Sequence, residues 1–214
     1  MYITWLGQSC FKLQDKTGPD GVTLVTDPFD KSIGLKVPNF EADIVTVSHS
    51  HFDHNNVASI RGTPYIIKTA GEYDLRGVTI YGVESFHDDK QGKERGVNII
   101  YRIDMDDVSI VHLGDLGQIL DNKQLEMLAG TDVLLIPVGG KFTIDAKQAM
   151  EVVSQIEPRI VIPMHYKLPD LKVGLDGVDK FIKEMGTKPR EEEKLKISKK
   201  GLSAEEMELV VMKV

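Results

Sequence analysis

Two nearly apolar segments flank one helical segment, and this arrangement constrains the fold of the chain most strongly. The segments Asp132–Val138 and Arg159–Met164 carry almost no polar side chains after their first residues. Between them, Asp145 can cap a helix that Pro158 ends. Apolar runs of this kind are typical of strands that are buried on both faces. The sequence therefore predicts an α/β fold.

In the rest of the chain, short strands are predicted mainly in the first half and further helices in the second half. A helix is expected over Asn122–Ala129 after Asp121, and another over Val178–Met185. The charged stretch Lys188–Lys200 is interpreted as a solvated linker or hairpin. The expected strands and turns are Tyr2–Leu6, Cys10–Leu13, a turn at Gly18–Gly21, Val22–Thr26, Ile44–Val47, Tyr65–Lys68, Val78–Val83, a hairpin of Asn98–Ile103 and Val108–Val111 around Asp104–Asp107, and Glu208–Val214.

Length, charge and cysteine content narrow the class of protein. With 214 residues the chain can bury a sizeable core, and we expect one domain over residues 1–214. Its net charge of −7 disfavours a nucleic-acid partner, which would need a basic face. No apolar run is long enough for a membrane span, and the first residues do not resemble a signal peptide. The single cysteine, Cys10, can form no intrachain disulfide and is expected to pack in the core, so a reducing, cytoplasmic location is expected.

The strongest local motif is His-Ser-His-Phe-Asp-His at His49–His54, in which four of the six residues are potential metal ligands. Imidazoles and carboxylates are the ligands of zinc and related divalent metals. The motif follows the apolar strand Ile44–Val47, which fixes the start of the loop. Asp53 and His54 should point in a different direction from the two histidines before them. One short loop could therefore serve two metals about 3.5–4 Å apart.

A short loop cannot complete two coordination spheres, so further ligands must come from elsewhere in the chain. The other histidines, His87, His112 and His165, all lie near the ends of predicted strands. Asp115 follows another strand, and a carboxylate at this position could bridge two cations. Asp27, also at a strand end, is interpreted as a residue that holds the histidine loop in place.

His87 and His112 compete for one position in such a site, because both precede Asp115 in the chain. His87 ends the strand that begins at Val78 and is followed by a polar stretch, the same setting as the other histidines of the site. His112 instead shares a strand face with apolar residues such as Ile110. We expect His87 to be the ligand and His112 to be a core residue that orients the Asp115 loop.

The order of these residues resembles that of the metallo-β-lactamase fold superfamily, with His-x-His-x-Asp-His at 49–54 followed by His87, Asp115 and His165. Further stretches resemble the predicted zinc-dependent hydrolases near the ascorbate-phosphate-lactonase-like branch of that superfamily. These stretches are Trp5–Gly7, Phe86–Asp88, Glu94–Gly96, His112–Gly117, Pro137–Thr143 and Ile162–Lys167. The resemblance runs from residue 1 to about 170 and is weak in the charged tail.

The resemblance implies a four-layer αββα sandwich with two divalent metals at one edge of its sheets. Zinc is the expected metal, with manganese, iron or nickel as alternatives. The implied ligands are His49, His51 and His87 for one metal, Asp53, His54 and His165 for the other, and Asp115 as the bridge. Histidine at position 51, where the diiron flavoproteins of this superfamily have glutamate, argues against oxygen reduction. Gln8 and Gln118 depart from the branch, since relatives commonly have histidine at these two positions near the expected site mouth.

The pattern favours a dinuclear metal-dependent hydrolase that acts on a small ester, lactone or phosphodiester. Two metals would polarise the scissile group and lower the pKa of a bound water to near 7, giving a metal-bound hydroxide. Asp53 would ligate one metal and could also accept a proton from that water. Lys141 and Tyr166 are the candidates for contacting charge on the substrate. The alternative is a metal-binding scaffold or sensor protein without turnover.

Overall fold

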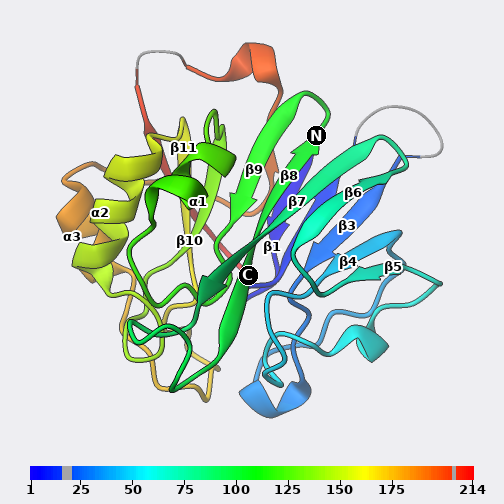
Figure 1. The fold of residues 1–214 in the computed structure, drawn as a ribbon, viewed down its shortest axis with the longest axis horizontal. Helices are drawn as coiled ribbons and strands as arrows, with labels where there is room; N and C mark the ends of the chain where they lie inside the picture. Colours follow the sequence, from blue (N-terminus) through cyan, green and yellow to red (C-terminus); the bar gives the residue numbers. More distant parts are fainter. Residues whose placement is uncertain (16–20, 204–205) are drawn as a thin grey trace.

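The structure is a computed structural model that describes residues 1–15, 21–203 and 206–214. Most of the expected turn at Gly18–Gly21 lies outside the described residues. The strands form two sheets that face each other, with the N-terminal strands in one sheet and the middle of the chain in the other (Figure 1). The main apolar core fills the space between them.

The smaller sheet begins with strands in which polar and apolar residues alternate. In β1 (Tyr2–Trp5) and β2 (Phe11–Gln14) every second residue is fully buried, because one face of each strand packs on the core. From β3 onward the strands are parallel. In spatial order the sheet contains β13 (Leu195–Lys196), β1, β2, β3 (Thr23–Thr26), β4 (Ile44–Thr46) and β5 (Tyr65–Ile67).

The larger sheet contains the two apolar segments Asp132–Val138 and Arg159–Met164. β10 (Val133–Pro137) and β11 (Ile160–Met164) pair in parallel, and every residue of both strands is buried. The prediction of strands covered on both faces is therefore confirmed. The other strands of this sheet, from β12 at one edge to β6 at the other, are β12 (Arg190–Glu192), β14 (Glu208–Met212), β9 (Val108–His112), β8 (Val97–Met105), β7 (Val78–Phe86) and β6 (Gly71–Leu75).

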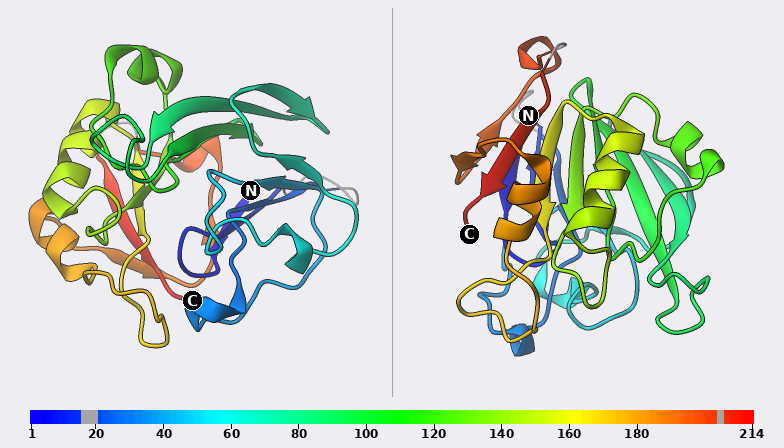
Figure 2. Two further views of the ribbon diagram at one scale, coloured as in Figure 1. Left: turned by 60° about the horizontal axis from the view of Figure 1, so that its bottom comes forward. Right: turned by 90° about the vertical axis from the view of Figure 1, so that its left-hand side faces the viewer.

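The helices lie on the face of the larger sheet that is turned away from the smaller sheet (Figure 2). α1 (Asn122–Met127) and α2 (Ala146–Ile156) begin at the predicted caps, Asp121 and Asp145, and each cap forms a capping box with the glutamine three residues later. The third predicted helix is also present as α3 (Asp179–Met185). None of the helices in the described residues has the length and apolar composition of a membrane span.

Loops form the outer layer of the smaller sheet. The connections after β3 and β4 contain two 3₁₀ turns, η1 (Lys31–Ile33) and η2 (Val57–Ser59), and they cover a second apolar cluster. Cys10 is fully buried in this cluster, as expected. The mixed α/β sandwich of two sheets is thus confirmed, although within the described residues its fourth layer consists of loops and 3₁₀ turns. One of these connections carries the His49–His54 motif.

Two predictions about the strands need correction. The stretch Lys188–Lys200 is not a hairpin, because β12 pairs with β14 in the larger sheet while β13 pairs with β1 in the smaller one. Dense charge hides these short edge strands, in which only Leu195 is buried. Strand β6 was not predicted either. It is an exposed edge strand joined to β7 by Arg76 and Gly77, both with positive φ, as in a tight hairpin turn.

Candidate metal centre

The potential ligands lie where strands of both sheets end at one edge. In the larger sheet, β7, β9 and β11 run in the same direction, because β8 is antiparallel to both β7 and β9, and β9, β10 and β11 are parallel. The His49–His54 loop follows β4 of the smaller sheet. From the larger sheet, His87 follows β7, Asp115 follows β9 and His165 follows β11. The seven predicted ligand residues are therefore brought together, whereas His112 stays within β9.

Asp115 lies at the centre of the cluster, with 2% of its surface exposed. Its Oδ2 atom is 3.2 Å from the Nε2 atom of His87 and 3.3 Å from that of His165. The Nε2 atoms of His54 and His49 lie 3.3 Å and 3.9 Å from the same oxygen. Ligand atoms of a tetrahedral zinc ion lie roughly 3.3–3.6 Å apart, given metal–ligand bonds of about 2.0–2.2 Å. The spacing around Asp115 therefore suits ligands that share a small cation.

Unpartnered polar atoms test whether the cluster fits a metal. Within the described residues, the buried atoms His49 Nε2, His54 Nε2 and Asp115 Oδ1 have no hydrogen-bond partner. Burying such atoms without a partner is costly, and several imidazolium ions cannot crowd around one carboxylate without repulsion. A divalent cation between the imidazole nitrogens and the carboxylate would satisfy these atoms. The residues present therefore fit a metal centre.

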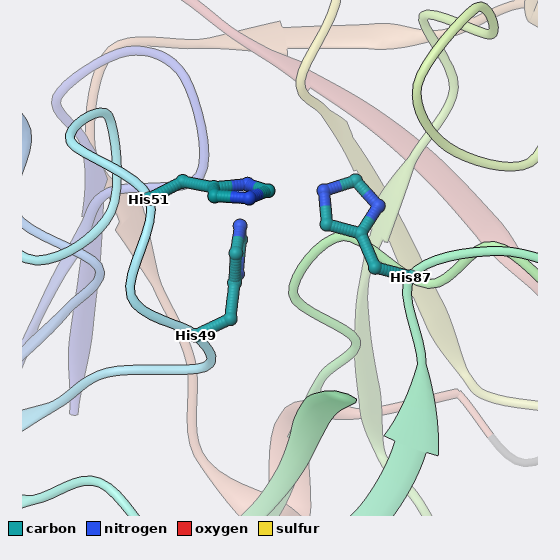
Figure 3. Close-up of side chains that lie close together, drawn as sticks. All are labelled: His49, His51 and His87. Atoms are coloured by element: carbon teal, nitrogen blue, oxygen red, sulfur yellow. The ribbon is translucent and has the colours of Figure 1, made fainter. Parts of the chain in front are cut away.

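The cluster divides into groups that match the expected ligand sets. His49, His51 and His87 offer ligand atoms within 4.8 Å of one another, and so do Asp53, His54 and His165. His49, His54 and Asp115 form a third such group between them. Figure 3 shows the rings of His49 and His51, from one loop, pointing toward His87 at the end of β7. That these side chains bind metal stays a prediction that metal analysis must test.

Hydrogen bonds beneath the cluster fix the orientation of two imidazoles. Asp27 accepts hydrogen bonds from the backbone N–H and the hydroxyl of Ser48, at 2.7 Å and 2.6 Å, and from Nδ1 of His54 at 2.9 Å. Because the Ser48 hydroxyl gives its proton to Asp27, its oxygen must accept from Nδ1 of His49, 2.9 Å away. Because Nδ1 of both histidines carries a proton, Nε2 is the atom that faces the cluster and that would bind a metal in its unprotonated form. The interpretation of Asp27 as support for the loop is confirmed.

Burial and charge set the protonation of the cluster. Burial, together with the nearby His54, lowers the pKa of His49 to about 3. Burial would raise the pKa of Asp53, but the neighbouring His54 imidazole lowers it to about 2. Burial lowers the pKa of His54, yet the surrounding carboxylates, Asp115 first, outweigh it and raise that pKa well above its ordinary value. A metal that binds His54 must therefore displace a proton, so metal affinity should decrease as the pH is lowered.

His112 is held by the backbone and does not join the cluster. Its Nε2 donates to the carbonyl of Ser9 at 2.8 Å, and its Nδ1 accepts from the N–H of Gly114 at 3.3 Å. Gly114 has a φ of +56°, and a Cβ there would lie 2.3 Å from the Asn98 side chain. The same Asn98 amide accepts from the Asp115 N–H. His112 therefore helps to shape the Asp115 loop, as expected.

Gln8 supports the site from below. It is fully buried, so the expectation that it lies near the site mouth is wrong. Its Nε2 donates to Oδ2 of Asp53 at 2.9 Å, and its carbonyl accepts from the His165 N–H at 3.1 Å. Gln118 instead contacts the Gln124 side chain and the neighbouring backbone. Only Gln8 is therefore placed to influence a ligand.

Replacing Gln8 with alanine is expected to weaken metal binding at the Asp53 side by about 10- to 100-fold, as loss of an outer hydrogen bond to a ligand typically does. The measurement is a competition titration of the metal-stripped protein against a chelator of known affinity. Gln118→Ala serves as the matched control and should leave the metal affinity unchanged. Equal losses in the two variants would show that the Gln8 hydrogen bond is not specific support for the ligand.

A cavity of about 260 Å³ opens onto the cluster. The cavity is lined by His51, Phe52, Asp53, His87, Arg95, Asp115, Phe142, His165 and Val173. Arg95 and Phe142 were not predicted as site residues, although they lie within two of the stretches that carry the family resemblance, Glu94–Gly96 and Pro137–Thr143. They could have been predicted from their positions, because each lies in a loop that follows a strand ending at the same edge of the sheet as the proposed ligands.

The two residues expected to contact the substrate do not line this cavity. Tyr166 is buried, packs on Trp5 with ring centroids 4.9 Å apart, and donates its hydroxyl to the Met212 carbonyl at 3.5 Å. His165 before it has a φ of +52°, so the backbone turns sharply between the two residues. Lys141 is exposed next to Phe142, which lines the cavity in its place. Tyr166 is thus a core residue, and Lys141 lies outside the cavity lining.

Comparison with known proteins agrees with the fold and the site. The family described as the beta-lactamase superfamily domain matches residues 2–165. A UPF0173 metal-dependent hydrolase of Methanoculleus marisnigri is 32% identical over 206 residues, covering 85% of this chain and 88% of the relative. A structure from Thermotoga maritima, described as a candidate Zn-dependent hydrolase of the metallo-β-lactamase superfamily, has a TM-score of 0.79 and 38% identity, covering 99% of this chain and 97% of that one.

A metallo hydrolase from Ignicoccus hospitalis shares the fold, with a TM-score of 0.65 and 24% identity, and covers 86% of this chain and 90% of its own. The expected superfamily is confirmed by the family match and by the two relatives above 30% identity. The chain therefore belongs to the β-lactamase superfamily and, within it, to the family of the UPF0173 metal-dependent hydrolases.

Proposed function

We propose that this metal-dependent hydrolase is dinuclear, uses zinc, and cleaves a small ester, lactone or phosphodiester. The observation that carries the proposal is the convergence of four imidazole Nε2 atoms on one oxygen of Asp115. One metal has too few coordination positions for all the donors of the cluster. The proposed ligands are His49, His51 and His87 for one metal, Asp53, His54 and His165 for the other, and Asp115 for both.

Bound at this position, the two metals would polarise the scissile group and acidify a water molecule. The protein side chains would handle the proton. Gln8 engages Oδ2 of Asp53, which leaves Oδ1 to accept a proton from the attacking water and pass it to the leaving group. The lowered pKa of Asp53 keeps its carboxylate ionised, as a metal ligand must be.

The cavity favours turnover over a scaffold or sensor role. Structural metal sites are closed by their protein ligands, whereas catalytic sites keep a position open for water or substrate. Here five of the proposed ligands line a cavity, and the volume of about 260 Å³ suits a small molecule. A small-molecule substrate in this cavity is therefore the partner that the proposal requires.

A substrate screen tests the proposal. Chelator-stripped protein reconstituted with zinc or manganese would be assayed with aryl esters, lactones and bis(p-nitrophenyl) phosphate, alongside stripped protein without metal. Metal-dependent turnover in one of these classes supports the proposal and names the substrate class. Two tightly bound metals without turnover in any class would favour the scaffold or sensor alternative.

A further inference from the structure

We propose that Arg95 determines substrate specificity by binding a carboxylate or phosphate group that is separate from the bond to be cleaved. The inference names the substrate class for the cavity, and it rests on the proposed function for the reacting end. Five of the residues that line the cavity are proposed metal ligands. The rest of a substrate must then contact the remaining wall, which is formed by Phe52, Arg95, Phe142 and Val173.

This wall combines one cation with apolar surface. Arg95 is the one lysine or arginine among the residues that line the cavity in the described part of the chain. Phe52 and Phe142 leave 58% and 37% of their surfaces exposed, although large aromatic side chains are usually covered. Aromatic rings at a small-molecule site provide contact area for a flat or apolar group. The wall therefore fits a substrate that carries both an apolar part and an anion.

The Arg95 loop is held in place by a buried carboxylate. Oδ2 of Asp88 accepts hydrogen bonds from the backbone N–H groups of Glu94 and Arg95, at 3.0 Å and 2.8 Å. Its Oδ1 accepts from the N–H groups of Lys90 and Gly92, at 2.8 Å and 2.9 Å. Asp88 therefore fixes the backbone on which the arginine is carried, so little ordering is left to be done when a ligand binds.

The guanidinium group of Arg95 is positioned but not neutralised. It lies over the ring of Phe142, 4.9 Å from the ring centroid, in a cation–π contact. Among the described residues, no acidic side chain forms an ion pair with Arg95, and the Asp88 carboxylate is occupied by backbone donors. This cation is retained at the cavity of a chain whose net charge is −7. A planar guanidinium with free donors is suited to bind a carboxylate or phosphate through two parallel hydrogen bonds.

Binding of aromatic acids to the zinc-loaded protein tests the role of Arg95 without any need for turnover. Benzoate offers one carboxylate, which can occupy the metal end, whereas terephthalate and isophthalate offer a second at two different spacings. We expect at least one dicarboxylate to bind roughly tenfold more tightly than benzoate, because its second carboxylate can accept charge-assisted hydrogen bonds from Arg95. Isothermal titration calorimetry measures the affinities.

Variants distinguish a direct contact of Arg95 with the second carboxylate from a general effect of positive charge near the cavity. Arg95→Gln should lose the dicarboxylate advantage and keep the benzoate affinity, while Arg95→Lys should retain part of the advantage. Lys93→Gln removes the same charge from an exposed position of the same loop and should keep all of it. Thermal melting checks that each variant is folded.

The inference is overturned if wild type shows no dicarboxylate advantage, if Arg95→Gln keeps it, or if Lys93→Gln loses it equally. The experiment also separates the two proposals. Arg95-dependent binding in a protein that hydrolyses no substrate would refute the proposed function alone. Hydrolysis that proceeds without any preference for anionic ligands would refute the inference alone.

Discussion

Replacing Asp115 with asparagine is expected to reduce hydrolysis by at least 100-fold, about 2.7 kcal/mol in the barrier, while the protein stays folded. The four imidazoles of the cluster converge on its carboxylate, and a neutral amide would bridge two cations poorly. The loop itself should survive, because the backbone N–H of Asp115 is held independently by Asn98. The measurement is kcat/KM on the best substrate of the screen, with circular dichroism to check the fold.

Asp132→Asn is the matched control for this experiment. Asp132 is equally buried, but it accepts from the Ser109 N–H and pairs with Lys199. It precedes β10, whereas Asp115 and His165 follow strands parallel to β10, so it lies at the opposite edge of the sheet from the proposed ligands. This variant should lose stability and keep its turnover. If Asp115→Asn retained more than about a tenth of wild-type turnover, under ~1.4 kcal/mol in the barrier, Asp115 would not be the bridging ligand.

His87→Ala is expected to leave about one tightly bound metal per chain, whereas His112→Ala should keep two. The His87 Nε2 lies 3.2 Å from Oδ2 of Asp115, so its removal takes a nitrogen from one proposed coordination sphere. Both ring nitrogens of His112 are instead engaged by backbone groups. The two variants therefore remove the same kind of side chain, in one case from a proposed metal ligand and in the other from a residue that only supports the loop.

Elemental analysis of both variants after reconstitution and gel filtration provides the readout. His112→Ala should lower the urea midpoint, since it leaves the Gly114 N–H without its partner and removes one of two donors to the Ser9 carbonyl. Metal content is therefore determined on the monodisperse folded fraction. Loss of one metal from His112→Ala with two retained by His87→Ala would mean that the third ligand of the first site is wrongly assigned.

The backbone of the site could be predicted because its residues stand at the ends of recognisable strands. The apolar segments now seen as β10 and β11 mark buried strands, and polar residues directly after such strands collect at one sheet edge. The pairing of His87 rather than His112 with the cluster also follows from strand alternation. The Asp121 and Asp145 caps predict the starts of two helices because capping is a local interaction.

The walls of the cavity could not be predicted in this way, because loops place them. Arg95 reaches the cavity through a loop whose shape depends on four backbone hydrogen bonds to Asp88, a pattern with no periodicity in sequence. Tyr166 was assigned to the site by its proximity to His165, yet the left-handed backbone of His165 sends the next side chain into the core. Neighbours in sequence are poor guides at such a turn.

The number of metals bound per chain tests the dinuclear site most directly. Protein stripped with a chelator would be reconstituted with zinc or manganese, freed of excess metal, and measured by elemental analysis against a quantitative protein concentration. The cluster offers seven ligand residues in overlapping groups, more than one tetrahedral ion can use. The expected result is close to two metals per chain, and a stoichiometry that stays at one or zero with every metal tested would contradict the dinuclear site.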